Sequence, residues 1–138
     1  MSACAKCGYD PAAKVGAAYV FRIDRDPPSL NERLHNAGDR RWAYAKQRNE
    51  WLQWFMVARA NHGITLASGR RRVTLTRLYG GRQQERDRDN LVGGMKVIVD
   101  AMVHALLLHD DSPQWAEIHY AQERGAARGL RVQIEDLT

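Results

Sequence analysis

The chain has 138 residues, the size of one domain with a modest core, and 44% of them are hydrophobic, which is ordinary for a folded protein. No apolar run approaches the ~20 residues that a membrane-spanning helix needs, and there is no charged-then-apolar leader, so we expect a cytoplasmic protein. The formal net charge of +5 favours an acidic partner, of which phosphate backbones are the commonest.

The first residues, 1–17, are small and polar without a periodic apolar pattern, so we expect a flexible segment ahead of a folded domain over 18–138. Cys4 and Cys7 have the spacing of a zinc-ligand pair, but tetrahedral zinc needs four ligands and no second pair follows. A site shared across a dimer, or recruitment of a histidine such as His35, is the alternative. Two cysteines build no disulfide framework, which fits a reducing compartment.

The first half of the domain reads as a strand and a helix. Residues 18–23 are aromatic and β-branched, which predicts a strand, and the prolines at 27–28 end it because proline donates no ladder hydrogen bond. Helical spacing of apolar residues predicts a helix over 40–62, followed by Gly63 as a stop. We expect its core residues to be Tyr44, Trp51, Leu52, Phe55, Met56 and Ala58.

The second half predicts three more strands around one helix. Residues 73–79 form an alternating strand that Gly80-Gly81 breaks, and an apolar stripe from Leu91 to Leu106 predicts a helix. Residues 115–120 and 130–134 read as strands, which we expect to pair as a hairpin. The resulting order, strand-helix-strand-helix-strand-strand, predicts an α/β (α+β) fold with a mixed four-stranded sheet and two main helices packed on it.

An acidic stretch frames the second helix. Asp87 and Asp89 stand two apart before it, Asp110 and Asp111 follow it, and the helix itself carries Lys96. Carboxylates held close together repel one another unless a cation or a proton is shared. Oxygen ligands of this kind suit Mg²⁺, which keeps waters for a substrate phosphate. In a basic chain, the pattern points to metal-assisted cleavage of a phosphodiester.

Ordinary structural explanations exist for each part of this stretch. Asp87-x-Asp89 is common in polar loops, and Asp110-Asp111 before Ser-Pro is typical of a turn. Lys96 precedes Asp100 by four residues, which by itself predicts a surface ion pair. The combination in this order, with a helix joining the two acidic ends, is what favours a metal site.

Taken together, these residues resemble the RusA family of Holliday junction resolvases, endonucleases of DNA recombination and repair that are common in prophages. The resemblance is carried by the run Asp-Arg-Asp-Asn-Leu at 87–91, then Lys96 and Asp100, then Asp110-Asp111. It extends roughly from Tyr19 to Leu137. This chain departs from the family pattern by three residues, Val92-Gly93-Gly94, ahead of the lysine.

The resemblance implies a function and a set of site residues. Asp87, Asp89 and Asp111 correspond to the family's metal-binding aspartates for one or two Mg²⁺ ions, which Mn²⁺ can replace, and Lys96 corresponds to its catalytic lysine. It also implies a homodimer that nicks a four-way DNA junction in two strands. The arginines that we expect to follow the DNA backbone, giving affinity without much sequence reading, are Arg70, Arg71, Arg72, Arg82, Arg86 and Arg88.

Two other functions stay open at the level of sequence. One is a non-catalytic DNA-binding prophage relic whose acids are merely solvated. The other is a different Mg²⁺ phosphohydrolase acting on nucleotides, although the long basic surface argues against so small a substrate. Neither the preferred cleavage dinucleotide nor the separate roles of Asp110 and Asp111 follow from the sequence.

Overall fold

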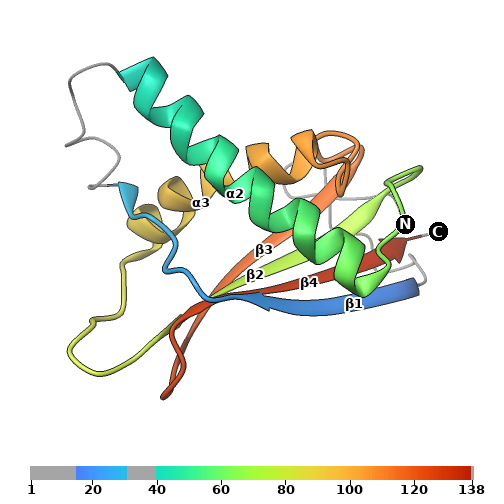
Figure 1. Cartoon of the computed structure of the whole chain (residues 1–138). Helices are drawn as coiled ribbons and strands as arrows, with labels where there is room; N and C mark the ends of the chain where they lie inside the picture. Colours follow the sequence, from blue (N-terminus) through green and yellow to red (C-terminus); the bar gives the residue numbers. More distant parts are fainter. Residues whose placement is uncertain (1–14, 31–39, 138) are drawn as a thin grey trace.

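A computed structural model of the chain describes residues 15–30 and 40–137 (Figure 1). The expectations for Cys4, Cys7 and His35 lie outside these ranges. The predicted flexible segment 1–17 does so as well, except for its last three residues, which belong to the first strand. None of the described helices is long and apolar enough to cross a membrane.

The predicted order of elements is confirmed, and the fold is α+β with a mixed four-stranded sheet and two helices. The elements are β1 Val15–Ile23, α2 Arg40–His62, β2 Arg71–Tyr79, α3 Arg88–His104, β3 Ala116–Arg124 and β4 Gly129–Leu137. Most observed strands are longer than predicted, because the ladder continues past the residues of highest strand propensity wherever a neighbouring strand remains to pair with.

The sheet order is β1-β4-β2-β3, with β2 and β3 parallel and β4 antiparallel to both of its neighbours. The predicted hairpin between the last two strands is therefore wrong. β4 is instead a central strand, and its alternate residues Leu130, Val132 and Ile134 are completely buried. Burial of three large aliphatic side chains, each contributing roughly 1.5–3 kcal/mol, favours the central place over an edge.

A tight backbone crossing makes this topology possible. The connection from β3 to β4 passes the end of β2, where the Gly125 N–H donates to the Tyr79 carbonyl at 2.8 Å. A Cβ atom on Gly80 would lie 2.0 Å from the Gly125 carbonyl oxygen, so only glycine fits there. The Gly80-Gly81 pair that predicted the end of β2 therefore also leaves room for the β3–β4 connection to pass close to that end.

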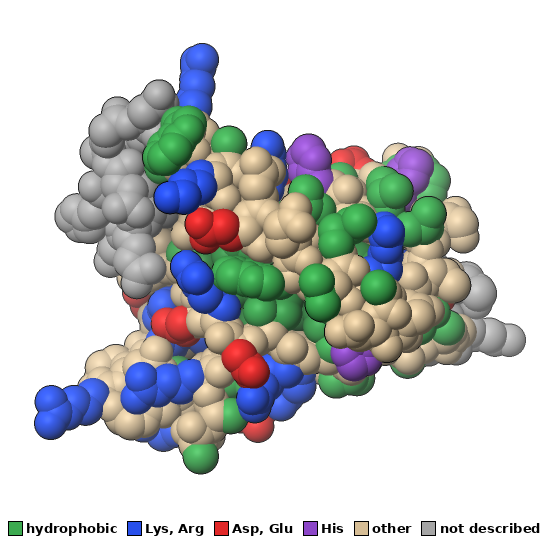
Figure 2. All heavy atoms as spheres, in the orientation of Figure 1, with side chains coloured by type: hydrophobic (Ala, Val, Ile, Leu, Met, Phe, Trp, Pro, Cys, Tyr) green, Lys and Arg blue, Asp and Glu red, His purple; other side chains and the backbone are tan. Residues whose placement is uncertain are grey.

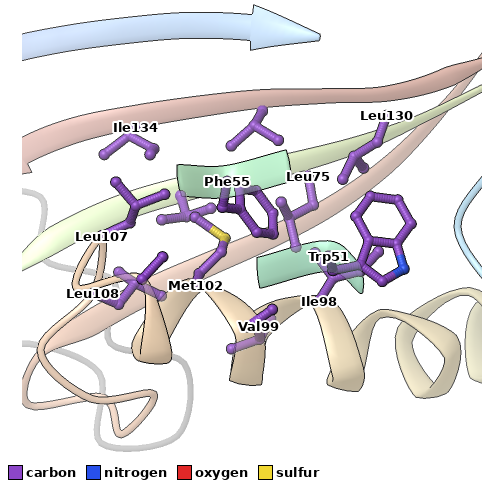
Figure 3. Packing of buried hydrophobic residues seen from close by; sticks show 14 of the residues in the cluster. Trp51, Phe55, Leu75, Ile98, Val99, Met102, Leu107, Leu108, Leu130 and Ile134 are labelled. Atoms are coloured by element: carbon purple, nitrogen blue, oxygen red, sulfur yellow. The ribbon is translucent and has the colours of Figure 1, made fainter. Parts of the chain in front are cut away.

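The hydrophobic core lies between one face of the sheet and the two helices (Figures 1 and 3). Trp51 and Phe55 of α2 and Ile98 and Met102 of α3 are buried against Leu75 of the sheet. Two residues of the predicted core stripes face solvent instead: Met56 is 38% exposed, and Leu106 is 51% exposed. Leu106 lies beyond the end of α3, so helical periodicity no longer sets its direction.

The glycines at 93–94 have a packing role in α3. A Cβ on Gly94 would lie 1.8 Å from the Pro28 carbonyl oxygen, and one on Gly93 would lie 3.0 Å from the Leu30 side chain. The segment after β1 therefore crosses directly over the first turns of α3. Two residues that weaken a helix start are in this way explained by the close approach of another part of the backbone.

Candidate functional site

The first acidic pair lies at the N-terminus of α3. Asp87 is the N-cap residue, with extended backbone angles (φ −63°, ψ 160°), and its side chain accepts a hydrogen bond from the Asn90 backbone N–H at 3.3 Å. The Asn90 side-chain amide donates to the other carboxylate oxygen of Asp87. Asp89 follows in the first turn, and both aspartates are exposed. Negative charge is favourable here because the helix dipole presents unpaired N–H groups.

The segment that carries Asp87 is fastened to the edge strand β3. The Gln122 side chain accepts from the Arg86 backbone N–H at 2.9 Å and donates to the Arg86 carbonyl at 2.6 Å, so one amide clamps both polar groups of that residue. Two residues further along the chain, Arg88 donates to the Tyr120 carbonyl at 3.1 Å, and its guanidinium lies 5.9 Å from the Tyr120 ring centroid. The backbone on both sides of Asp87 is therefore tied to β3.

A second set of contacts, centred on Asp26, fixes the loop that leads to Asp87. The Asp26 carboxylate accepts hydrogen bonds from Arg77 at 3.2 Å, from Arg86 at 3.2 Å and from Gln83 at 3.1 Å. Arg86 also donates to the Pro27 carbonyl at 2.6 Å. Arg77 is 3% exposed and the Asp26 side chain is 35% exposed, so this charge-assisted pair is partly shielded from solvent.

The structure separates the roles of Asp110 and Asp111. The pKa of Asp110 is lowered, first by a hydrogen bond from the Ser112 hydroxyl and then by one from the Asp111 backbone N–H. Asp110 is thus a turn residue that stabilises the entry to β3. Asp111, by contrast, acts electrostatically on Tyr120.

Tyr120 is a side chain on which charged groups from both acidic ends act electrostatically. Burial raises the pKa of its phenol, the charge of Asp111 raises that pKa further, and the guanidinium of Arg88 opposes both effects. Asp111 therefore lies within electrostatic range of the same side chain over which Arg88, the residue between Asp87 and Asp89, is placed. Tyr120 was predicted only as part of a strand, and no sequence signal indicated this position between the two ends.

The carboxylates are not gathered into a complete ligand set. Across residues 15–30 and 40–137, no three His, Cys, Asp or Glu side chains lie close enough together to hold a metal ion. Asp87, Asp89 and Asp111 are all exposed, and like charges favour separation unless a cation is shared. What the fold supplies is a fixed backbone for Asp87 and Asp89 and a loop carrying Asp111 toward the same strand.

Lys96 lies on α3 with its side chain exposed. Among the ion pairs between described residues, none joins Lys96 to Asp100, so the ordinary i,i+4 pair is not formed. Asp100 instead accepts a hydrogen bond from the Tyr44 hydroxyl, which ties α3 to the first half of α2. The lysine ammonium is therefore not neutralised by the carboxylate that the sequence places beside it.

The burial of Arg71 corrects one of the six predicted DNA contacts. Arg71 is 1% exposed and is bound within the protein, while Arg72 and Arg86 bond to Glu117 and Asp26. Arg71 points toward the core face of the sheet, Arg72 points to the opposite face and Arg86 lies in the loop before α3. Arg82 and Arg88 are exposed, while the other three arginines, Arg70, Arg72 and Arg86, are partly exposed.

Glu117 of β3 is a buried carboxylate that no sequence pattern indicated as a site residue. It is completely buried, and its Oε1 atom accepts from Arg72 Nε at 3.1 Å and contacts His119 Nε2 at 2.7 Å. Burial by itself raises the pKa of Glu117, but the hydrogen bonds from His119 and Arg72 outweigh it and hold the pKa below its ordinary value. Glu117 therefore stays ionised inside the fold.

The sequence matches no model of a known protein family, and no curated protein matches it.

Proposed function

We propose that this protein is a Mg²⁺-dependent, structure-selective endodeoxyribonuclease that resolves four-way DNA junctions by paired nicking. The observation that carries the proposal is the fastening of the Asp87-Arg88-Asp89 run to β3. The Asp87-Arg88-Asp89 run is fastened to β3 by Gln122 and Tyr120, and Asp111 acts on the same tyrosine from the other end of α3. A run that only filled a solvated loop would need no such fastening.

The residues of this chain have separate tasks in the proposed reaction. Asp87, Asp89 and Asp111 offer hard oxygen ligands for Mg²⁺ or Mn²⁺, which when bound would activate water and stabilise the charge on the scissile phosphate. Lys96 would lend positive charge to the phosphate or to the leaving oxygen, as electrostatic stabilisation. Arg88 lies between the two aspartates and offsets their repulsion of DNA.

We further propose a homodimer. A four-way junction has two strands to cut in symmetrical positions, and a two-fold dimer matches that geometry. The proposal rests on the substrate's symmetry and on the family resemblance.

The test uses a synthetic four-way junction with Mg²⁺ and compares the wild type with Asp89→Asn. Asp89 is the better choice than Asp87, because Asp87 caps α3 and its replacement would also cost helix stability. We expect paired nicks near the crossover in the wild type and none in Asp89→Asn. Asp24→Asn, which alters an exposed aspartate paired with Arg22, is the matched control and should cut normally.

The role of Lys96 is tested separately. Lys96→Ala should leave junction binding intact and slow cutting of the bound complex, because the ammonium acts on the reacting phosphate. Loss of binding with an unchanged rate per bound complex would assign Lys96 to DNA affinity instead.

The second candidate is a DNA-binding protein without nuclease activity. The observation that favours it is the lack of a gathered three-ligand group among the described residues. Tight junction binding with no nicks under Mg²⁺ and Mn²⁺ would decide for this candidate.

A further inference from the structure

Two loops next to Asp87 form one projecting unit, which we call the basic projection and define as residues 80–86 and 124–128 (Figure 1). Arg124 holds them together by donating to the Gly81 carbonyl at 3.2 Å and to the Gln83 carbonyl at 2.7 Å. Its guanidinium also lies 5.0 Å from the Tyr79 ring centroid. The projection is thus a built structure whose two loops hold each other in place.

The projection is strongly basic. Its 12 residues include four arginines, Arg82, Arg86, Arg124 and Arg128, against a single acid, Glu85. Arg82 and Arg128 are both exposed, and within the described part of the chain neither forms an ion pair. Lys and Arg side chains gather over the end of the molecule from which these loops extend (Figure 2).

The position of the projection relates it to the proposed site. Arg82 precedes Asp87 by five residues, which an extended chain spans in at most ~17 Å. Phosphates of one DNA strand are spaced by about 3.4 Å along the helix axis, so Arg82 lies within roughly five base steps of a phosphate bound to a metal ion that Asp87 would hold. Side chains with this charge and spacing match a nucleic-acid backbone.

We propose that the basic projection binds the phosphate backbone of the junction arm beside the cleavage point, through Arg82 and Arg128. This inference rests on the proposed function and adds to it a DNA-contacting surface that includes Arg128, which lies far from the acidic motif in the sequence. Guanidinium groups suit this partner because their planar donors pair with two phosphate oxygens at once. The contact carries no base reading, so it sets affinity and orientation without sequence preference.

The experiment measures junction binding in Ca²⁺ over a range of salt concentrations, so that no cutting is needed. Each arginine–phosphate contact contributes about 0.9 to the slope of log affinity against log salt. The double variant Arg82→Ala with Arg128→Ala should therefore lower the slope by about 1.8 and weaken binding roughly 10- to 60-fold at about 0.1 M salt.

Two controls make the result specific. The pair Arg82→Lys with Arg128→Lys keeps the charge and should keep the slope. Arg22→Ala, on β1 and already paired with Asp24, should leave it unchanged. Circular dichroism of the alanine pair checks the fold; if the pair is unfolded, the charge-reversed single variants Arg82→Glu and Arg128→Glu replace it and should each weaken binding.

The possible failures are distinguishable. A wild type that binds no junction overturns the proposed function itself. A wild type that binds and cuts, with an unchanged salt slope in the alanine pair, overturns the role of the projection and leaves the nuclease proposal standing.

Discussion

The two ends of β2 each carry a buried arginine on the core face of the sheet, and the two arginines bind different parts of the molecule. Arg71, at the start, is 1% exposed and bonds to Asp136 at 2.6 Å, to the Leu107 carbonyl at 3.0 Å and to the Thr65 carbonyl at 2.8 Å. Arg77, near the other end, is 3% exposed and bonds to Asp26 at 3.2 Å and to the Gln84 carbonyl at 3.0 Å.

The difference lies in what each arginine holds. The partners of Arg71 belong to β4 and to loops that close one end of the core. The partners of Arg77 are Asp26 in the segment after β1, Gln84 in the loop that leads to Asp87, and Gln122 of β3, which binds Arg86 next to Asp87. The same residue type on the same face of one strand therefore stabilises the fold at one end and positions the candidate site at the other.

The largest expected effect comes from removing the first arginine. Arg71→Leu leaves Asp136 and two backbone carbonyls without their donor, and we expect a loss of about 3–5 kcal/mol in the free energy of unfolding. Urea unfolding measures this loss. Mn²⁺ affinity of the folded fraction should not change, whereas Arg77→Leu should lower both stability and Mn²⁺ affinity. Equal losses of Mn²⁺ affinity in the two variants would contradict the assignment of Arg77, and not Arg71, to the candidate site.

A smaller loss of stability is expected at Glu117, which lies on β3 opposite Arg72 of β2. Glu117→Gln weakens the hydrogen bonds to Arg72 and His119, which we expect to cost about 1.5–3 kcal/mol. Because the folded-state pKa is below the ordinary value of 4.5, this stabilisation is present above that pH and is lost as the pH falls through the folded-state pKa.

The measurement is urea unfolding of wild type and Glu117→Gln at neutral and acidic pH, where the gap between them should narrow as the pH falls. The matched control is Glu123→Gln, which should have little effect on stability. Glu123 is an exposed glutamate on β3, the strand of Glu117, and it pairs with Arg131 of β4. A gap that stayed constant with pH would mean that Glu117 is not ionised in the folded protein.

The fold was largely predictable because its elements are marked by local signals. Apolar periodicity identified both helices, and Gly80-Gly81 marked the end of β2. The neighbours of β4 were not predictable in this way. A short connection favours a hairpin. The actual pairing depends on the burial available between β1 and β2, and on Gly80, which lets the β3–β4 connection pass close to the end of β2.

Only the aspartate motif of the candidate site could be predicted from the sequence. The spacing of Asp87, Asp89 and Asp111 is visible in the sequence, but whether an arginine faces DNA or the core depends on tertiary contacts, as Arg71 shows. Gln122 gave no signal, since a glutamine on a strand is chemically unremarkable until its backbone partner is known.

The next prediction concerns that glutamine. Gln122→Leu removes the clamp on Arg86 and should weaken Mn²⁺ binding by roughly tenfold, in the range typical of residues that orient metal ligands. Gln133→Leu, a half-buried glutamine on β4, is the matched control, and calorimetric titration with Mn²⁺ compares the two. Hydrogen exchange of the Arg86 amide gives a second readout, because loss of the clamp should speed it. Unchanged exchange and affinity in Gln122→Leu would remove Gln122 from the site.

The smallest expected effect tests whether the two acidic ends meet at Tyr120, without any need for catalysis. Burial and Asp111 raise the pKa of the phenol and Arg88 lowers it, so Asp111→Asn should lower that pKa and Arg88→Ala should raise it. Tyrosinate absorbance in an alkaline titration, with Tyr120→Phe to identify the signal, measures both shifts.

The adjacent acid provides the control for this titration. Asp110→Asn should leave the Tyr120 pKa in place, because the Asp110 carboxylate is engaged with Ser112 in the turn. Since the folded-state pKa is raised, the stability that depends on the neutral phenol is present below the ordinary value of 10.0 and is lost as the pH rises through the folded-state pKa. If Asp111→Asn left the titration of Tyr120 unchanged, Asp111 would lie too far from β3 to share a cation with Asp87 and Asp89.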